Sequence, residues 1–146
     1  MNISAKSRYA VRALVELAQH TDGQPVPISD IAARREIPLQ FLEQLFSSLR
    51  KAGILNSHRG VRGGFSFKKL PEDVSVLDVV EILDGNVAPS ACTSGATCNK
   101  IDRCIMKEVW FDVKSNLESV LGAANIADLA DRESLMRERA EEMYYI

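Results

Sequence analysis

The three cysteines of this chain lie in one polar segment, at Cys92, Cys98 and Cys104, with five residues between neighbours. Structural zinc sites usually have about two to four residues between paired cysteines. A thioredoxin-like redox site needs Cys-x-x-Cys beside a βαβ unit, and the sequence predicts neither. A flexible loop with three thiols suits an iron–sulfur cluster, which takes about four protein ligands, most often thiolates. The spacing therefore favours such a cluster over three unrelated buried thiols.

Length and composition limit where this segment can act. The 146 residues are 46% hydrophobic, enough for the core of one domain. No apolar run approaches the roughly 18 to 20 residues of a membrane span, and the first residues lack the pattern of a secretory signal. We expect a cytoplasmic protein with no membrane partner, in which thiols stay reduced or bind metal. No Cys-His-acid set, phosphate-binding glycine loop or metal-hydrolase motif is present, so we do not expect an enzyme.

The charge is divided unevenly along the chain. Residues 1–70 carry eleven Lys and Arg against five Asp and Glu, a net of +6, whereas residues 71–146 carry seven against fifteen, a net of −8. A basic half of this kind suits a polyanion such as nucleic acid, although a solvated basic face is the commoner explanation.

The first half has the element order of a winged helix-turn-helix. We predict helices over 4–20, over 30–35 with Ser29 as its cap, and over 39–52, followed by strands over 54–59 and 65–68. On the third helix one face is apolar, and polar side chains cover the rest. Amides and hydroxyls on that polar face would read base edges, while Arg59 and Arg62 on a glycine-rich wing would approach a phosphate backbone or a minor groove. The alternative is a small helical domain with an ordinary surface hairpin.

The second half predicts a capped helix, the cysteine loop and a long helix. Ser75 caps a helix over 76–84, the loop follows over 86–104, and a long helix resumes at Ile105. That helix carries a broad apolar stripe that includes Ile105, Val109, Val113, Leu117 and Leu121. We expect a second copy of the chain to cover the stripe, since DNA readers of this kind usually bind as two-fold dimers, and an intramolecular cover is the alternative. We expect only a short or frayed helix over 131–146.

Four motifs resemble the IscR/NsrR-type family of winged helix-turn-helix transcription regulators, the Rrf2 family. They are SAKSRYAVRAL at 4–14, LQFLEQLFSSLRKAGIL at 39–55, SHRGVRGGF at 57–65 and the evenly spaced cysteines. The resemblance covers about residues 1–130. It implies a mainly α fold with a small β-hairpin wing and a long C-terminal dimerisation helix. The domains would be 1–70 for DNA binding, 71–104 for the connecting helix and cluster loop, and 105–146 for dimerisation and the tail.

The resemblance also implies a function and a set of site residues. The chain would be a homodimeric repressor or activator whose binding to a double-stranded operator depends on a 2Fe-2S or 4Fe-4S cluster held by the three cysteines. The implied DNA-contacting residues are Lys6, Arg8, Tyr9, Ser29, Gln40, Glu43, Gln44, Ser47, Arg50, Arg59 and Arg62. The cluster would sense iron, redox state or nitric oxide. A clusterless family member, sensing oxidants through its thiols or responding to a metabolic protein partner, is the alternative.

The fourth cluster ligand departs from the family pattern. Where one branch of the family has a histidine this chain has Lys107, and where another branch has an aspartate it has Arg8. Lysine and arginine are protonated at neutral pH and are poor ligands. The remaining candidates are Glu43, Asp102 and Glu108, or a water or small thiol. A site completed by such a ligand would hold iron weakly and respond readily to oxygen, nitric oxide or iron scarcity.

Overall fold

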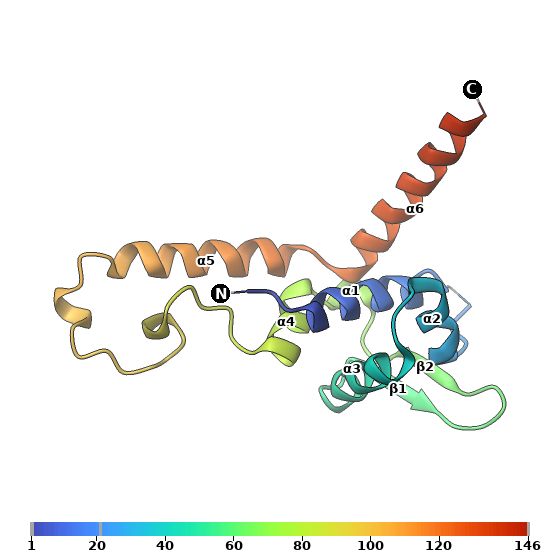
Figure 1. Cartoon of the computed structure of the whole chain (residues 1–146), viewed down its shortest axis with the longest axis horizontal. Helices are drawn as coiled ribbons and strands as arrows, with labels where there is room; N and C mark the ends of the chain where they lie inside the picture. The colour runs from blue at the N-terminus through green and yellow to red at the C-terminus, as the bar shows by residue number, and fades with distance from the viewer. Residues whose placement is uncertain (1, 21, 146) are drawn as a thin grey trace.

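The computed structural model describes residues 2–20 and 22–145, and its fold is mainly helical with one β-hairpin (Figure 1). The helices are α1 Ala5–Ala18, α2 Ile28–Arg35, α3 Leu39–Lys51, α4 Val76–Asp84, α5 Lys107–Ala123 and α6 Ile126–Tyr144. The strands are β1 Leu55–His58 and β2 Gly64–Phe67, and short 3₁₀ turns occupy Pro71–Asp73, Ala91–Thr93 and Ile101–Arg103. None of the described helices is long and apolar enough to cross a membrane.

The core is formed where α1, α2, α3 and the hairpin meet. α3 buries Leu42, Leu45, Phe46 and Leu49 against α1 and α2, so the predicted division of this helix into an apolar and a polar face is confirmed. Burial of such side chains stabilises the fold by roughly 25 cal/mol for each Å² of apolar surface removed from water. These four side chains thus anchor α3, while most of its polar side chains stay at the surface.

The start of α2 differs from the sequence prediction. We expected Ser29 to cap a helix beginning at Asp30, but α2 begins at Ile28, and Ser29 lies exposed inside its first turn. Pro27 is the N-cap residue, and its carbonyl oxygen accepts hydrogen bonds from the backbone N–H groups of Asp30 and Ile31. A proline with its fixed φ is well suited to start a helix, which explains the earlier boundary.

The connection between α2 and α3 is the short turn expected of a helix-turn-helix. Glu36 adopts a left-handed conformation, with φ 54° and ψ 44°, and is the one non-glycine residue with positive φ in the described chain. Such a conformation costs a residue with a Cβ about 1–2 kcal/mol. The neighbouring Ile37, buried and bonded through its N–H to the Ala32 carbonyl, fixes the turn.

The wing is a two-stranded antiparallel hairpin with an additional contact at its base. Leu55 pairs with Phe67 and His58 with Gly64, and two 2.9 Å backbone hydrogen bonds join Phe65 to Val26. At Gly64 a Cβ would lie 2.2 Å from the Val26 carbonyl oxygen, so this close approach requires glycine. The segment before α2 therefore fixes the root of the wing.

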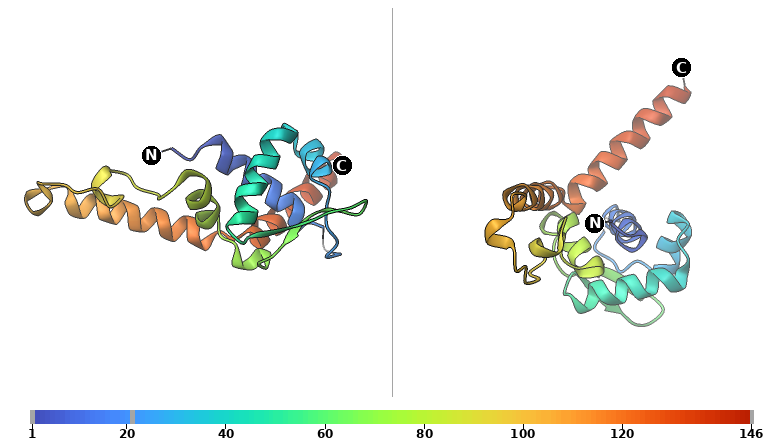
Figure 2. Two further views of the ribbon diagram at one scale, coloured as in Figure 1. Left: turned by 90° about the horizontal axis from the view of Figure 1, so that it is seen from below. Right: turned by 60° about the vertical axis from the view of Figure 1, so that its left-hand side comes forward.

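α5 and α6 extend beyond this body (Figures 1 and 2), whereas α4 packs against α1 and α3. α4 has the predicted Ser75 cap, reinforced by a capping box with Asp78. α5 begins at Lys107 rather than Ile105, and together with the cysteine loop it forms an arm on one side of the body. The end of α5 is fixed by backbone hydrogen bonds from Val76 to Ala124 and from Ile126 to Val74.

The expectation of a short or frayed C-terminal helix is wrong. α6 runs from Ile126 to Tyr144, and Asn125 caps it by accepting a hydrogen bond from the Asp128 N–H. Its first turns pack against α1, with Ile126 and Ala130 buried, while its last turns project from the body (Figure 2). Because nearly half of the α6 residues are charged, a periodicity argument from sequence gave little sign of this helix.

Candidate DNA-binding surface and cysteine loop

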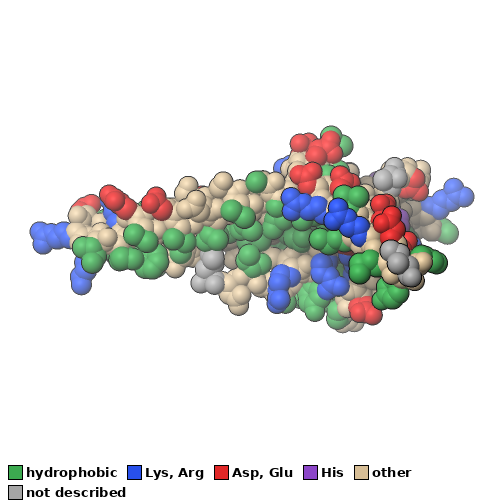
Figure 3. Space-filling view, turned by 90° about the horizontal axis from the view of Figure 1, so that it is seen from above, with side chains coloured by type: hydrophobic (Ala, Val, Ile, Leu, Met, Phe, Trp, Pro, Cys, Tyr) green, Lys and Arg blue, Asp and Glu red, His purple; other side chains and the backbone are tan. Residues whose placement is uncertain are grey.

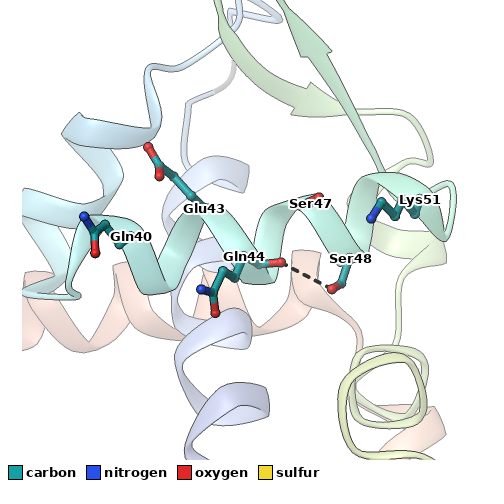
Figure 4. Close-up of a pocket in the computed structure, with 6 residues that line it drawn as sticks. All are labelled: Gln40, Glu43, Gln44, Ser47, Ser48 and Lys51. Atoms are coloured by element: carbon teal, nitrogen blue, oxygen red, sulfur yellow. Dashed lines mark hydrogen bonds between the residues drawn. The ribbon is translucent and has the colours of Figure 1, made fainter.

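Six polar or charged side chains of α3 surround one hollow on the outside of this helix (Figure 4). This open hollow is lined by Gln40, Glu43, Gln44, Ser47, Ser48 and Lys51. The Ser48 hydroxyl donates to the backbone carbonyl oxygen of Gln44 at 3.2 Å, so this hydrogen bond does not use the Gln44 side-chain amide. Amide, carboxylate and hydroxyl groups on one helix face are the groups that pair with base edges in the major groove.

The lining of the hollow differs at three positions from the α3 residues predicted to contact DNA. Ser48 and Lys51 share the hollow with Gln44, which lies one or two helical turns before them. Their spacing of four and seven residues from Gln44 places them on the same helix face, a sequence signal that could have identified them. Arg50, by contrast, is exposed near the end of α3 but does not line the hollow.

The wing presents its two arginines to solvent. Arg59 and Arg62 are both exposed on the turn of the hairpin, beside a fully exposed Val61. Phe65 of β2 packs edge-on against Phe46 of α3, with ring centroids 5.1 Å apart. This contact joins the wing and α3 into one packed unit.

The N-terminal helix supports the same unit. Lys6 and Arg8 are exposed, as expected of phosphate contacts, and Ser29 is exposed on α2. Tyr9 is half-buried and packs edge-on against Phe41 of α3 at 5.8 Å, with the Arg12 guanidinium 5.9 Å from its ring centre. Tyr9 therefore has a packing role in addition to any contact with DNA.

The cysteine loop lies on the arm, away from α3 in the same chain (Figure 1). Cys92 and Cys98 are half-buried, Cys104 is exposed, and all three are free thiols. The Cys92 sulfur lies 3.1 Å from the Ser90 hydroxyl oxygen. α5 holds the loop through Lys114, whose ammonium donates to the Thr93 carbonyl oxygen at 2.9 Å.

The loop does not gather its ligand candidates into one site. Among the described residues, no three His, Cys, Asp or Glu side chains are close enough to bind a single metal ion. Asp102 and Glu108 are exposed on either side of Cys104 in the sequence, whereas Glu43 lies on the α3 surface. Within one chain the structure therefore places Glu43 on the polar face of α3 and apart from the thiols.

The apolar stripe of α5 is only partly covered. Leu117 and Leu121 are half-buried, and α4 packs against this helix. Ile105, Val109 and Val113 are 94%, 45% and 37% exposed. Figure 3 shows hydrophobic side chains gathered along this arm. An intramolecular partner thus covers one part of the stripe and leaves the other part open.

Comparisons with known proteins agree with this arrangement. Residues 3–132 match the Rrf2 family, described as iron-dependent transcriptional regulators. The transcriptional regulator IscR of Vibrio atlanticus is 38% identical over 129 residues, which cover 88% of this chain and 75% of that protein.

Solved structures resemble the chain over nearly its whole length. IscR of T. potens has a TM-score of 0.72 and 33% identity, with 91% of this chain and 88% of that chain covered. CymR, the global cysteine regulator of B. subtilis, has a TM-score of 0.75 and 28% identity, with 90% and 98% covered. With an exposed reading helix, a packed wing and these relatives, the chain belongs to the Rrf2 family of transcriptional regulators.

Proposed function

We propose that this chain is a homodimeric DNA-binding regulator whose operator affinity is controlled by an iron–sulfur cluster bound through Cys92, Cys98 and Cys104. The observation that carries the proposal is the position of the three thiols. They lie on a single loop between α4, which packs against the reading head (α1, α2, α3 and the wing hairpin), and α5, whose apolar side is open. A change in that loop would therefore act on α4 and α5. These two helices would set the position of the reading head relative to a second copy of the chain.

The DNA contacts follow from the exposed polar groups. Gln40, Gln44 and Ser47 of α3 would read base edges, and Lys6 and Arg8 would contact phosphates. Arg59 would enter the minor groove. Glu43 would oppose phosphates and disfavour wrong sequences, since a carboxylate on a reading face repels the backbone.

The donor chemistry of the loop fits a cluster. Thiolates are the usual ligands of iron–sulfur clusters, and these three have no disulfide or buried structural role in the described chain. Holding one cluster requires the loop to bring the three thiols together, and Gly95, with φ 91°, gives it freedom to do so. Asp102 and Glu108 are the ligand candidates beside Cys104. A bound cluster would make the shape of the loop depend on oxidants and iron supply.

Direct thiol chemistry is the second candidate. It is favoured by the separation of the three thiols in the structure and by the likeness to CymR. In this mechanism oxidation of the exposed Cys104 or its half-buried neighbours would change the loop without any metal.

The two mechanisms are separated by purification without air. We expect a brown wild-type protein with thiolate-to-iron absorption bands that contains iron and acid-labile sulfide. The variant with serine at the three cysteine positions should lose the absorption bands, the iron and the sulfide. Thr97→Ser, in the same loop but with every thiol retained, should keep the cluster. A colourless, iron-free protein with redox-dependent DNA binding would instead establish thiol sensing. If serine at all three positions leaves DNA binding and its redox response unchanged, neither mechanism operates.

A further inference from the structure

The start of α1 is bonded to the end of α4 through one carboxylate. Asp84, the last residue of α4, accepts a hydrogen bond from the Ser4 N–H at 3.0 Å and one from the Ser7 hydroxyl at 2.7 Å. The Ser4 hydroxyl donates to its other oxygen. Ser7 is only 1% exposed, so its hydroxyl depends on Asp84 for a partner within the protein.

This contact lies beside an expected phosphate-contacting residue. Lys6 is exposed between the two serines, and its positive charge helps to stabilise the Asp84 carboxylate. Partial desolvation acts to raise the pKa of Asp84, but the hydrogen bonds from Ser4 and Ser7 outweigh it, and the pKa lies below its ordinary value. Asp84 is therefore ionised at neutral pH and lowers the positive charge that the first turn of α1 presents.

Asp84 is also where the cysteine loop begins. Gly85 follows it with φ 85°, and Cys92 comes eight positions after Asp84. Val87 is buried, and a cavity of about 170 Å³ lies between residues 84–88 and the N-terminal residues Asn2 and Ile3. The first part of the loop thus lines the same cavity as the segment that leads into α1.

The far side of this connection is anchored as well. Thr93, next to Cys92, is 3% exposed, and its carbonyl oxygen is held by Lys114 of α5. A change at Cys92 therefore cannot be absorbed freely by the residues around it. A displacement at Cys92 would reach Asp84 through residues 85–91 or α5 through the Lys114 contact.

We propose that Asp84 is a positioning residue that couples the cysteine loop to the phosphate-contacting end of α1. When the loop pulls Asp84 away, the Ser7 hydroxyl loses its acceptor and Lys6 loses a neighbouring carboxylate, so both the position and the charge of the first turn change. Coupling of this kind is reciprocal: the loop state alters DNA affinity, and bound DNA alters the loop. The inference rests on the proposed control of DNA binding by the cysteines.

The test is the ratio of DNA dissociation constants before and after oxidation. The probe is a duplex selected by the air-free wild-type protein from random sequences, at one fixed salt concentration, and the oxidant is hydrogen peroxide, which destroys clusters and oxidises thiols. We expect a wild-type ratio within the range of about 5- to 150-fold that is typical of coupled sites. Asp84→Ala should bring the ratio to within about twofold of one.

Glu81→Ala is the matched control, because Glu81 is an exposed carboxylate on the same helix. It should retain the wild-type ratio. If Asp84→Ala fails to fold, as circular dichroism would show, Ser7→Ala removes the buried hydrogen bond to Asp84 from the α1 side and should also lower the ratio. An Asp84→Ala protein that binds more weakly in both states, with the wild-type ratio preserved, would make Asp84 merely structural and overturn the inference. A wild-type ratio near one would instead refute cysteine control itself.

Discussion

The Arg35 guanidinium at the end of α2 lies 2.8 Å from the Glu133 carboxylate of α6, measured from Nη2 to Oε1, although the two residues are 98 positions apart. Arg35 Nε also lies 2.7 Å from Glu16 Oε2 on α1. The Arg35 and Glu16 side chains are only 9% and 7% exposed. One buried cation thus ties the C-terminal helix to both helices that support the reading head.

Removal of the Glu133 charge should destabilise the fold. Because Arg35 would keep only part of its partners, Glu133→Gln should lower the free energy of unfolding by about 1–3 kcal/mol. Urea unfolding at matched protein concentration measures this. Glu138→Gln, an exposed position on the same helix, should change it by less than about 0.5 kcal/mol. Equal effects of the two substitutions would show that the Arg35 contact contributes nothing.

The same network predicts loss of stability in acid. The hydrogen bond from Arg35 lowers the pKa of Glu133. Burial acts to raise the pKa of Glu16, but Arg35 and Arg34 outweigh it, and that pKa is lowered too. Carboxylates with lowered folded pKa values stabilise the fold above their ordinary value of about 4.5, and this stability is lost as the pH falls through the folded values. Between about pH 6 and 3, the free energy of unfolding measured in urea should therefore fall more steeply for wild type than for Glu133→Gln. Parallel curves of this free energy against pH would contradict the prediction.

The packing of Phe65 against Phe46 joins the wing to α3, so in the proposed function both would contact DNA together. Arg59→Ala should weaken binding by about 1–3 kcal/mol at sites with a narrow A·T-rich minor groove, and by less at other sites. Fluorescence anisotropy with matched duplexes measures the difference. Lys69→Ala removes an equal charge from an exposed position after β2 and should show no such sequence dependence. A uniform loss for Arg59→Ala would place this arginine on the phosphate backbone.

The open side of α5 predicts a self-association interface. Val113→Asp places a charge on the exposed part of the apolar stripe, where burial against a second copy would be costly. We expect sedimentation to show a shift from dimer to monomer and a marked loss of DNA affinity. Ser115→Asp adds the same charge to an exposed residue of the same helix that lies off the stripe, and it should remain dimeric. Dimers of undiminished strength in Val113→Asp would exclude this face.

Much of the reading head could be predicted from the sequence because its signals are local. The apolar spacing of Leu42, Leu45 and Leu49 identified the buried face of α3, and Ser75 marked the start of α4. The glycines of the wing marked its turn. The prediction failed at Ser29, where a residue of the usual capping type follows a proline that starts the helix first.

The sequence by itself determined the helix order, the polar reading face, the basic wing and the presence of three thiols on one loop. These depend on spacing within one or two turns of chain. Only the tertiary structure decided that Arg35 joins Glu133, that Asp84 joins Ser4 and Ser7, and that Glu43 stays apart from the thiols. Such contacts connect residues far apart in the chain, and their partners are selected by how whole helices pack, which no local pattern encodes.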